Sequence, residues 1–195
     1  SFMILVLIGS FLLMLPSATT NGITFTNALF TATSAVCVTG LTVVDTAVDF
    51  TIVGQSIIIV LIQLGGIGIL TFTSFFAFFF RSSSSFKEGL NIRDFIANDG
   101  LKDVFRAAVN VVVFTLGVEL VGALFIYSSI VDNAIIEHKF YFSLFHSISA
   151  FCNAGFSTLP GGILNTTVKF NYYLQWILML MIILGGLGHN IVFNF

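Results

Sequence analysis

Charged side chains are scarce in this chain of 195 residues. Asp, Glu, Lys and Arg make up 8% of it, whereas they make up about 25% of an average soluble domain. Hydrophobic residues account for 57% of the sequence and include 24 Phe, while only 2 Pro are present. Uncharged apolar windows of about 18 residues recur, a length typical of a transmembrane helix. The composition therefore argues against a soluble core and predicts a chain that lies in lipid, with no patch for nucleic acid.

The motifs of common enzymes are also missing. The sequence holds no Gly-x-Ser-x-Gly, His-Glu-x-x-His or P-loop pattern, so neither an intramembrane protease nor an ATPase is indicated. The two cysteines, Cys37 and Cys152, are 115 residues apart, which fits neither a zinc motif nor a secreted disulfide framework. We therefore expect a protein that is not an enzyme.

No Lys or Arg precedes Arg81, although a signal peptide would begin with a basic residue. The chain starts at Ser1, and the apolar run from Phe2 to Leu15 is shorter than the ~20 residues needed to cross a bilayer. Residues 191–195 are still apolar. These features predict a fragment that is truncated at both ends and begins inside a helix.

Four apolar segments predict membrane helices. Two further segments between them are rich in Ser, Thr, Ala, Gly and Cys and are too short to cross the bilayer comfortably. The long segments are Phe2–Leu15, Phe50–Phe80, Val104–Val131 and Phe170–Phe195, and the short ones are Phe25–Leu41 and Phe140–Phe156. We therefore expect an all-α membrane protein.

Basic residues are concentrated in one connecting stretch, because five of the seven lie between residues 81 and 106. The positive-inside rule places residues 81–103 in the cytoplasm. Acidic residues in the opposite loops either raise the local cation concentration at the outer mouth or are ordinary solvated loop residues. They are Asp45, Asp49, Asp132 and Glu137.

An internal repeat organises the sequence. Residues 30–41 (Phe-Thr-Ala-Thr-Ser-Ala-Val-Cys-Val-Thr-Gly-Leu) match residues 145–156 (Phe-His-Ser-Ile-Ser-Ala-Phe-Cys-Asn-Ala-Gly-Phe) without gaps at Phe, Ser-Ala, Cys and Gly. A Gln followed by Leu-Gly-Gly-x-Gly occurs at 55–68 and again at 175–188. Such self-similarity indicates two copies of one unit, each made of a helix, a short loop element and a helix.

Both copies have the same orientation, because a unit with two full crossings returns the chain to its starting side. Each short element must then enter and leave the membrane on the side opposite the basic stretch. Unpaired backbone groups at membrane depth cannot face lipid, so they must line a cavity filled with water or ions. The sequence therefore predicts two tandem helix–pore-loop–helix repeats whose loops enter from the extracellular side.

Each short element predicts a helix followed by an extended segment suited to a cation. Helices over about Phe25–Val36 and Phe140–Phe151 would aim their partially negative C-terminal ends at the membrane centre. The residues that follow are small or modest in size, so backbone carbonyl oxygens can approach an ion and replace its hydration. We predict potassium-binding, selectivity-filter positions at Cys37, Val38, Thr39, Gly40, Cys152, Asn153, Ala154 and Gly155.

Gly40 and Gly155 are the strongest of these candidates. Glycine permits a positive φ, which would turn consecutive carbonyls toward a common axis without a Cβ clash. A single glycine after a helix is explained equally well as an ordinary C-cap. Its occurrence at the same place in both repeats favours the filter.

Other unusual residues in apolar segments have simpler explanations. The Gly-Gly-x-Gly stretches at 65–68 and 185–188 lie inside helices, which favours close helix packing or a kink over phosphate binding. Glu119 is the one acidic residue in the middle of an apolar helix, where a carboxylate costs about 2.5–3.5 kcal/mol. It has either a functional role or a hydrogen-bonded, structural one at a helix interface. His146 and His189 receive no role.

The two loop sequences and the Gly-Gly-x-Gly helices resemble the Trk/Ktr/HKT superfamily of potassium transporters, most closely the Ktr-type membrane subunit, over nearly the whole chain. The resemblance implies four helix–pore-loop–helix repeats around one pore, of which this chain would hold the first two. It also implies that Gly at the first filter position, here Gly40, goes with potassium, whereas relatives with Ser there tend to carry sodium. The gating elements of the family belong to the third and fourth repeats.

The same resemblance implies that the full-length protein forms a homodimer in the plasma (inner) membrane. There it would sit on a cytosolic ring of nucleotide-binding regulatory subunits, which residues 81–103 would help to contact. The lipid bilayer is its other expected partner. We expect no covalently bound cofactor, with potassium as the substrate and sodium as a candidate coupling ion.

The predicted organisation is a first repeat over residues 1–80, a cytoplasmic connector over 81–103 and a second repeat over 104–195. The predicted function is potassium uptake across a membrane through a carbonyl-lined selectivity filter. One alternative is a sodium-selective member of the same superfamily, and another is a non-conducting membrane scaffold in which the loops serve only packing. A carrier for organic substrates is a weaker third alternative.

Overall fold

The computed structural model describes residues 2–83, 100–131, 133, 135, 136 and 138–187. Within these residues the chain forms six α-helices, one short 3-10 helix and no strand beyond an isolated bridge between Thr19 and Phe50. The all-helical class predicted from the sequence is confirmed. In chain order the elements are α1 (Phe2–Leu13), α2 (Phe25–Val36), α3 (Ile52–Ser83), α5 (Gly100–Ile130), α6 (Lys139–Phe151), η1 (Gly162–Leu164) and α7 (Tyr172–Leu187).

The long helices α3 and α5 reach into the stretch predicted as a connector, since α3 ends at Ser83 and α5 begins at Gly100. The remainder of that stretch, residues 84–99, lies outside the described residues. So do four other positions that the sequence singled out. They are Asp132, Glu137, Gly188 and His189.

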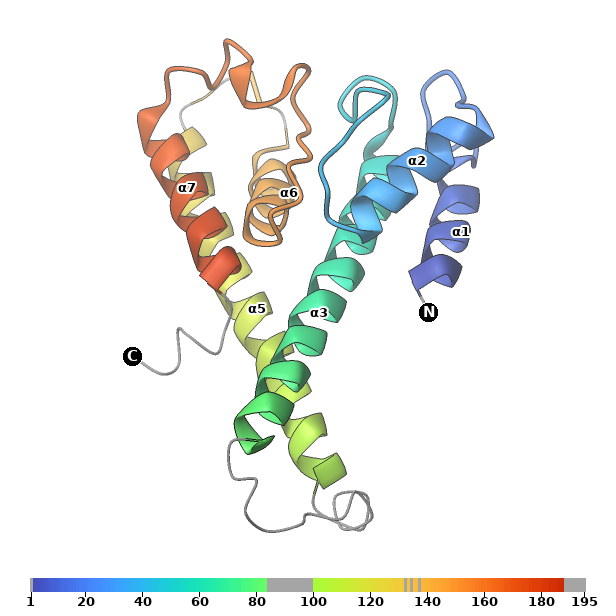
Figure 1. The fold of residues 1–195 in the computed structure, drawn as a ribbon. Helices are drawn as coiled ribbons and strands as arrows, with labels where there is room; N and C mark the ends of the chain where they lie inside the picture. Colours follow the sequence, from blue (N-terminus) through green and yellow to red (C-terminus); the bar gives the residue numbers. More distant parts are fainter. Residues whose placement is uncertain (1, 84–99, 132, 134, 137, 188–195) are drawn as a thin grey trace.

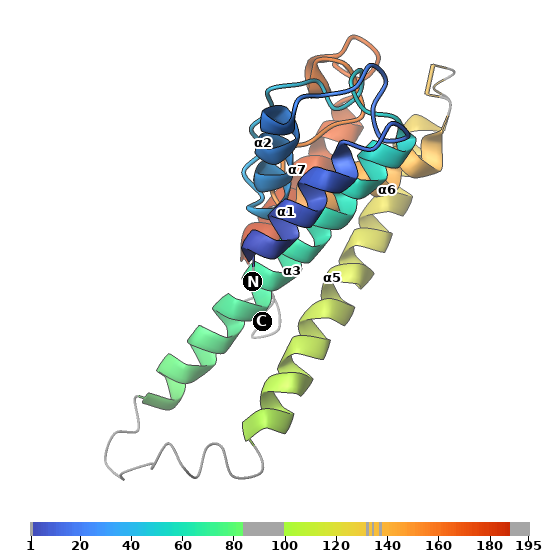
Figure 2. The same cartoon turned by 90° about the vertical axis from the view of Figure 1, so that its right-hand side faces the viewer.

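Helices α1, α2 and α3 pack on one another, and so do α5, α6 and α7. We call these groups the N-terminal half (residues 2–83) and the C-terminal half (residues 100–187). Figures 1 and 2 show that α3 and α5 run the length of the molecule, with the end of α3 and the start of α5 at the same end. The short helices α2 and α6, and the loops around them, lie at the opposite end. The halves meet where α3 contacts α5 and α6.

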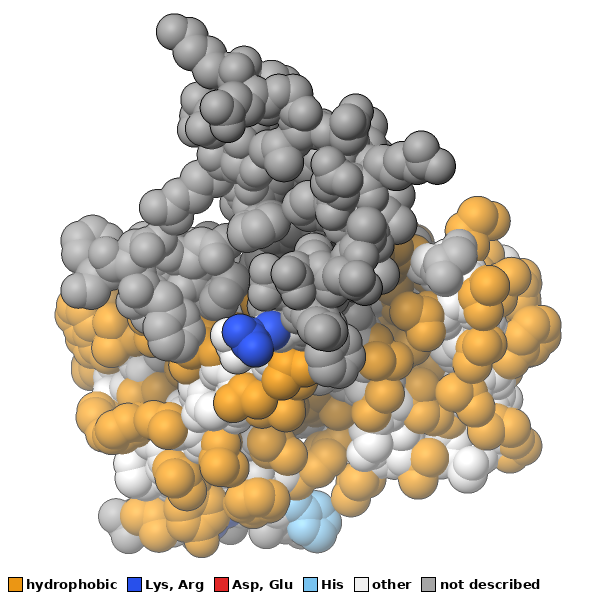
Figure 3. All heavy atoms as spheres, turned by 90° about the horizontal axis from the view of Figure 1, so that it is seen from below, with side chains coloured by type: hydrophobic (Ala, Val, Ile, Leu, Met, Phe, Trp, Pro, Cys, Tyr) orange, Lys and Arg blue, Asp and Glu red, His pale blue; other side chains and the backbone are white. Residues whose placement is uncertain are grey.

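Among the described residues, two helices are long and apolar enough to cross a membrane, over Ile52–Ile69 and Ala108–Ile130, while α1 and α7 are apolar but shorter. Large apolar side chains on their outer surfaces are exposed, including Val113 at 65% and Leu124 at 59%. Figure 3 shows that such side chains cover most of the described surface in that view, with one small basic patch. This surface suits lipid, because burying apolar groups against one another brings no gain in an apolar solvent.

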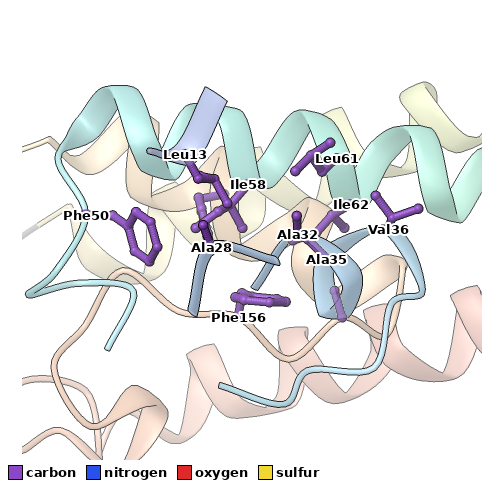
Figure 4. Close-up of a cluster of buried hydrophobic side chains, with 12 residues drawn as sticks. Leu13, Ala28, Ala32, Ala35, Val36, Phe50, Ile58, Leu61, Ile62 and Phe156 are labelled. Carbon is purple, nitrogen blue, oxygen red and sulfur yellow. The ribbon is translucent and has the colours of Figure 1, made fainter. Parts of the chain in front are cut away.

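A cluster of buried apolar side chains fills the N-terminal half, built from α1, α2 and α3 (Figure 4). Small residues on α2, Ala28, Ala32 and Ala35, let this helix approach Ile58 of α3 closely. Three members of the cluster come from the C-terminal half. They are Phe145, Ala154 and Phe156. The core of one half is therefore completed by the loop of the other.

One close contact occurs in both halves, between the first helix of each half, α1 or α5, and the two helices beside it. A Cβ built on Gly9 of α1 would lie 2.7 Å from the side chain of Leu61 and 3.4 Å from that of Ala32. A Cβ built on Gly122 of α5 would meet the corresponding residues of its own half, Met181 at 2.5 Å and Ser147 at 2.6 Å. This match aligns Gly9 of α1 with Gly122 of α5.

Candidate functional site

Helices α2 and α6 end in the same backbone motif, at the start of the predicted filter segments. After α2, the Thr39 N–H donates to the Ser34 carbonyl (2.9 Å) and the Val38 N–H donates to the Ala35 carbonyl (3.2 Å). This pair of bonds defines a Schellman motif, which ends a helix by placing the residue after the C-cap in the left-handed region. The corresponding bonds after α6 join Ala154 to Ser149 (2.7 Å) and Asn153 to Ala150 (3.0 Å).

The left-handed position of each motif is not occupied by glycine. Val38 has φ 55° and Asn153 has φ 59°, and a second positive φ follows two residues later, 74° at Gly40 and 72° at Gly155. The expectation that an extended segment begins directly at Cys37 and at Cys152 is therefore wrong, because the Schellman bonds impose a turn first. The alternative of Gly40 as an ordinary C-cap is also wrong, since the capping turn ends before it.

Over the part of the chain that the structure describes, no backbone or side-chain hydrogen-bond donor reaches the carbonyl oxygens of the eight predicted filter residues. Positive φ at alternate residues also breaks the strand pattern, in which successive groups point to opposite sides. Carbonyl groups need a partner when they are removed from water. Of these eight residues Ala154 is buried and its oxygen lies against Gly40. The other seven are at least partly exposed, so their oxygens are available to a cation or to water.

The structure brings the two predicted filter segments together. A Cβ built on Gly40 would lie 2.5 Å from the Ala154 carbonyl oxygen and 3.5 Å from the Gly155 Cα atom. Residue 40 must therefore be glycine for this approach, in addition to its positive φ. A hollow of about 430 Å³ opens beside the contact, lined by residues of both loops that include Gly40, Asp45 and Gly155.

The Gly-Gly-x-Gly helices hold the ends of α2 and α6. A Cβ built on Gly65 of α3 would lie 2.0 Å from the carbonyl oxygen of Val36, the last residue of α2. In the C-terminal half, a Cβ on Gly185 of α7 would lie 1.7 Å from the carbonyl oxygen of Phe151, the last residue of α6. The prediction of close helix packing is confirmed for these two glycines.

His146, which received no role from the sequence, ties α6 to the segment after the predicted filter. Its Nδ1 lies 2.9 Å from the Phe142 carbonyl oxygen and its Nε2 lies 2.9 Å from Ser157 Oγ. A carbonyl oxygen only accepts, so a neutral ring that donates from Nδ1 and accepts the Ser157 hydroxyl satisfies both contacts. Ser149 adds a second tie by donating to the Phe156 carbonyl at 2.7 Å. No periodicity in the sequence predicts these two bonds, because each joins a residue of α6 to a loop residue that lies 7 or 11 positions later.

Asp45 and Asp49, predicted for the outer loops, have structural partners. Asp49 accepts the Asp45 N–H at 2.7 Å, and Asp45 accepts the N–H groups of Ala47 at 2.8 Å and Gly161 at 3.2 Å. The last bond joins the loops of the two halves. Since Asp45 also lines the hollow, its carboxylate lies beside the surface through which a cation would approach Gly40.

Glu119 lies at a helix interface and is 2% exposed. Gln63 of α3 donates to its Oε2 at 2.9 Å, and the Cys152 thiol donates to its Oε1 at 3.7 Å. The hydrogen-bonded interface position predicted as one alternative for Glu119 is therefore confirmed. Cys37, the counterpart of Cys152, is exposed and unbridged.

Among the described residues there is no cluster of three or more His, Cys, Asp or Glu side chains that would suit a metal ion. The predicted filter segments offer backbone carbonyl oxygens, and the hollow beside them is also lined by Asp45. Rings of such carbonyls suit alkali cations, whose hydration shell they replace.

Comparisons with known proteins find relatives that are named as cation transport proteins. The TrkH model, described as a cation transport protein, matches residues 1–195. The chain is 35% identical to the Ktr system potassium uptake protein B of Bacillus subtilis over 193 residues, which covers 99% of this chain and 43% of that protein. It is 32% identical to the protein of the same name from Vibrio alginolyticus over 192 residues, which covers 98% and 42% of the two chains.

A further relative is the potassium/sodium uptake protein NtpJ of Enterococcus hirae, 34% identical over 189 residues, with 96% of this chain and 42% of that protein covered. These relatives are named as transport proteins and none of the three as an enzyme. The chain spans less than half the length of each of them.

Proposed function

Because the chain belongs to the TrkH family of cation transport proteins, we propose that it forms part of a potassium uptake protein in which the segments after α2 and α6 line the ion path. The observation that carries this proposal is the set of carbonyl oxygens without donors on two loops that meet at Gly40 and Gly155. In a non-conducting scaffold, the conformation that leaves these carbonyl oxygens without donors would have no explanation. A potassium ion is a suitable partner, because carbonyl dipoles can replace its water.

The ends of α2 and α6 strengthen the attraction for a cation. Each helix carries a partial negative charge at its C-terminus, and each ends directly at a predicted filter segment. No Lys or Arg lies within either segment to oppose this field. The helices therefore favour a cation over an anion where the two loops meet.

The conformation of Val38 supports a functional role for its segment. A β-branched residue with φ 55° is uncommon, and a residue held in such a region costs about 1–3 kcal/mol. Backbone strain of this kind clusters at binding sites, where the surrounding structure imposes it. The strain at Val38 is consistent with a loop shaped for its ligand.

Potassium is the favoured ion because the resemblance to the Trk/Ktr/HKT superfamily implies that glycine at position 40 goes with potassium. A side chain at residue 40 would meet the Ala154 carbonyl and would change the spacing of the oxygen atoms around an ion. Sodium is the second candidate, since NtpJ is named as a potassium/sodium uptake protein. For sodium, the same carbonyls would have to close around a smaller ion.

We further place the loops on the extracellular side of a plasma membrane and the basic stretch in the cytoplasm. The two relatives called protein B are named as parts of a Ktr system. By analogy, the full-length protein would pair with a second copy and with a cytosolic nucleotide-binding regulatory subunit. Sodium remains a candidate coupling ion.

The test is potassium uptake by a transport-deficient bacterium that expresses the full-length protein, compared with its Gly40→Ser and Gly155→Ser variants. We expect wild type to restore growth at low potassium. Each variant should lower the ratio of potassium to sodium uptake by about tenfold, which corresponds to about 1.4 kcal/mol. Gly155→Ser is the milder variant sterically, because its Cβ would meet only the Gly40 Cα at 3.6 Å.

Gly22→Ser is the matched control. Gly22 also has a positive φ of 74°, but a Cβ built on it meets nothing within 4 Å, and it lies before α2. This variant should keep the wild-type ratio. Unchanged selectivity in both Gly40→Ser and Gly155→Ser, with normal amounts in the membrane, would reject the filter assignment.

A further inference from the structure

Three polar side chains meet at the start of the second predicted filter segment. They are Gln63 of α3, Glu119 of α5 and Cys152, which directly follows α6. The Gln63 amide and the Cys152 thiol donate to the two oxygens of the Glu119 carboxyl group, at 2.9 and 3.7 Å. One carboxyl group therefore joins the N-terminal half to the base of the loop of the C-terminal half.

Neither Glu119 nor Gln63 belongs to the repeated plan of the two halves. The alignment of Gly9 with Gly122 places Val6 of α1 opposite Glu119. The 120-residue offset between α3 and α7 pairs Gln63 with Ile183, whose side chain is 49% exposed. Each of these two polar residues therefore lies where the other half has an apolar residue, and the two contact each other. Two independent departures that meet in one hydrogen bond indicate a specific task at this contact.

The Cys152 side chain is held on two sides. A Cβ built on Gly66 of α3 would lie 2.6 Å from the Cys152 Sγ atom, so glycine at residue 66 makes room for the thiol. Glu119 binds the thiol on the other side, and its backbone carbonyl accepts the Ser147 hydroxyl of α6 at 2.6 Å. In the N-terminal half the equivalent Cys37 is exposed.

We propose that Gln63 and Glu119 form a positioning pair that holds Cys152, the innermost residue of the second loop, in place. By holding this residue, the pair sets the discrimination between potassium and sodium. The inference rests on the proposed function. Cys152 begins the four residues whose carbonyls would face the ion. Discrimination between ions that differ little in size requires these carbonyls to keep their spacing, and a supporting shell of hydrogen bonds supplies such rigidity.

The proposal predicts that hydrogen bonding at residue 119 matters and that its negative charge does not. Glu119→Gln keeps the shape of the side chain and an oxygen that accepts from Cys152, whereas Glu119→Leu removes both side-chain hydrogen bonds and keeps the backbone bond to Ser147. We expect Glu119→Leu to lower the potassium-to-sodium uptake ratio at least about fivefold in the full-length protein. Glu119→Gln should stay within about twofold of wild type.

A cycle of variants separates positioning from general stability. Gln63→Leu should lower the ratio as Glu119→Leu does, and the double variant should lower it no further, because residues in one network are not additive. Ser128→Ala on α5, which removes only a local bond to the Phe125 carbonyl, is the control. Uptake is normalised to folded protein in the membrane, since a purely structural role would reduce the amount and leave the ratio unchanged.

The inference is overturned if Glu119→Leu keeps the wild-type ratio, or if Glu119→Gln loses as much as Glu119→Leu. Where Glu119→Leu fails to reach the membrane, Cys152→Ala and Cys152→Ser decide the question. The serine variant keeps a donor to Glu119 and should keep the ratio, while the alanine variant should lower it. Wild-type protein that carries no potassium in the same cells would instead reject the proposed function.

Discussion

At the scale of single residues, the two predicted filter segments share a backbone without sharing side chains. Val38 and Asn153 both adopt the left-handed region after a helix. Asn tolerates this conformation because its short polar side chain can bond locally, whereas Val does so under strain. The common geometry therefore comes from the two Schellman hydrogen bonds and from the glycine two residues later, and not from the identity of the left-handed residue.

Gly65 offers a direct test of the packing at the end of α2. Gly65→Ala should destabilise the protein by about 1–3 kcal/mol, because overpacking has this cost and the new Cβ would lie 2.0 Å from a carbonyl oxygen. The free energy of unfolding of the purified protein in detergent would be compared for variant and wild type. Gly117→Ala is the control, since a Cβ there meets nothing within 4 Å, and it should stabilise α5 by about 0.5–1 kcal/mol.

Equal stability of Gly65→Ala and Gly117→Ala would contradict the close contact between α3 and α2.

Residue-scale geometry was only partly predictable from the sequence. Gly40 and Gly155 could be found because positive φ is common for glycine, and both have it. Val38 could not, because a β-branched residue normally predicts extended backbone. His146 was missed for a different reason: its partner Ser157 lies beyond a loop, and no helical or strand periodicity relates the two positions.

At the scale of elements, capping interactions join helices as well as ending them. Asn171 precedes α7, and its Oδ1 accepts the Leu174 N–H at 3.0 Å, which is an N-cap bond. Its Nδ2 donates to the Ser129 carbonyl near the end of α5 at 2.8 Å. One side chain thus starts α7 and attaches it to α5.

Two substitutions at Asn171 separate these tasks. Asn171→Asp keeps the cap and loses the donor to Ser129, so it should cost about 0.5–1.5 kcal/mol. Asn171→Ala loses both and should cost about 0.5–2 kcal/mol more. Thermal unfolding of the purified protein would rank wild type above the aspartate variant and the aspartate variant above the alanine variant. An alanine variant as stable as the aspartate variant would show that the cap contributes nothing.

Element positions were predictable because apolar length and flanking composition determine them. The expected short helices over Phe25–Val36 and Phe140–Phe151 match α2 and α6 to within one residue. The ends of α3 and α5 were less predictable, since polar and charged residues continue in helical conformation into Ser83 and from Gly100. Charge marks the edge of the membrane and does not by itself end a helix.

At the scale of the whole molecule, charge distribution predicts the orientation in the membrane. Arg106 lies just before the apolar span of α5, and Lys169 lies in the loop before α7, at the opposite end of the fold. Both side chains are exposed. The positive-inside rule therefore predicts Arg106 in the cytoplasm and Lys169 outside.

This orientation can be measured with single cysteines in a Cys37→Ser, Cys152→Ser background. A membrane-impermeant thiol reagent should label Lys169→Cys in intact cells and Arg106→Cys only in inverted vesicles. The cysteine-free background should remain unlabelled in both preparations. Labelling with the opposite sidedness would reverse the proposed orientation of both loops.

The contact between the halves was the least predictable feature of the fold. The repeat predicts two similar units, but it does not predict that Phe156 of one fills the core of the other, or that Gly40 lies against the Ala154 carbonyl. Gln63 and Glu119 depart from the repeat, so the repeat carries no information about their pairing. Contacts between units depend on side chains that differ between the units.

The insertion of Phe156 into the core of the N-terminal half has a consequence for synthesis. Phe156 follows the end of α3, Ser83, by 73 residues. At ~5–20 residues per second, a ribosome needs about 4–15 s to make that interval. Until then the cluster beside α2 lacks the three side chains that the C-terminal half supplies. We therefore expect the N-terminal half to complete its core only after Phe156 has been made.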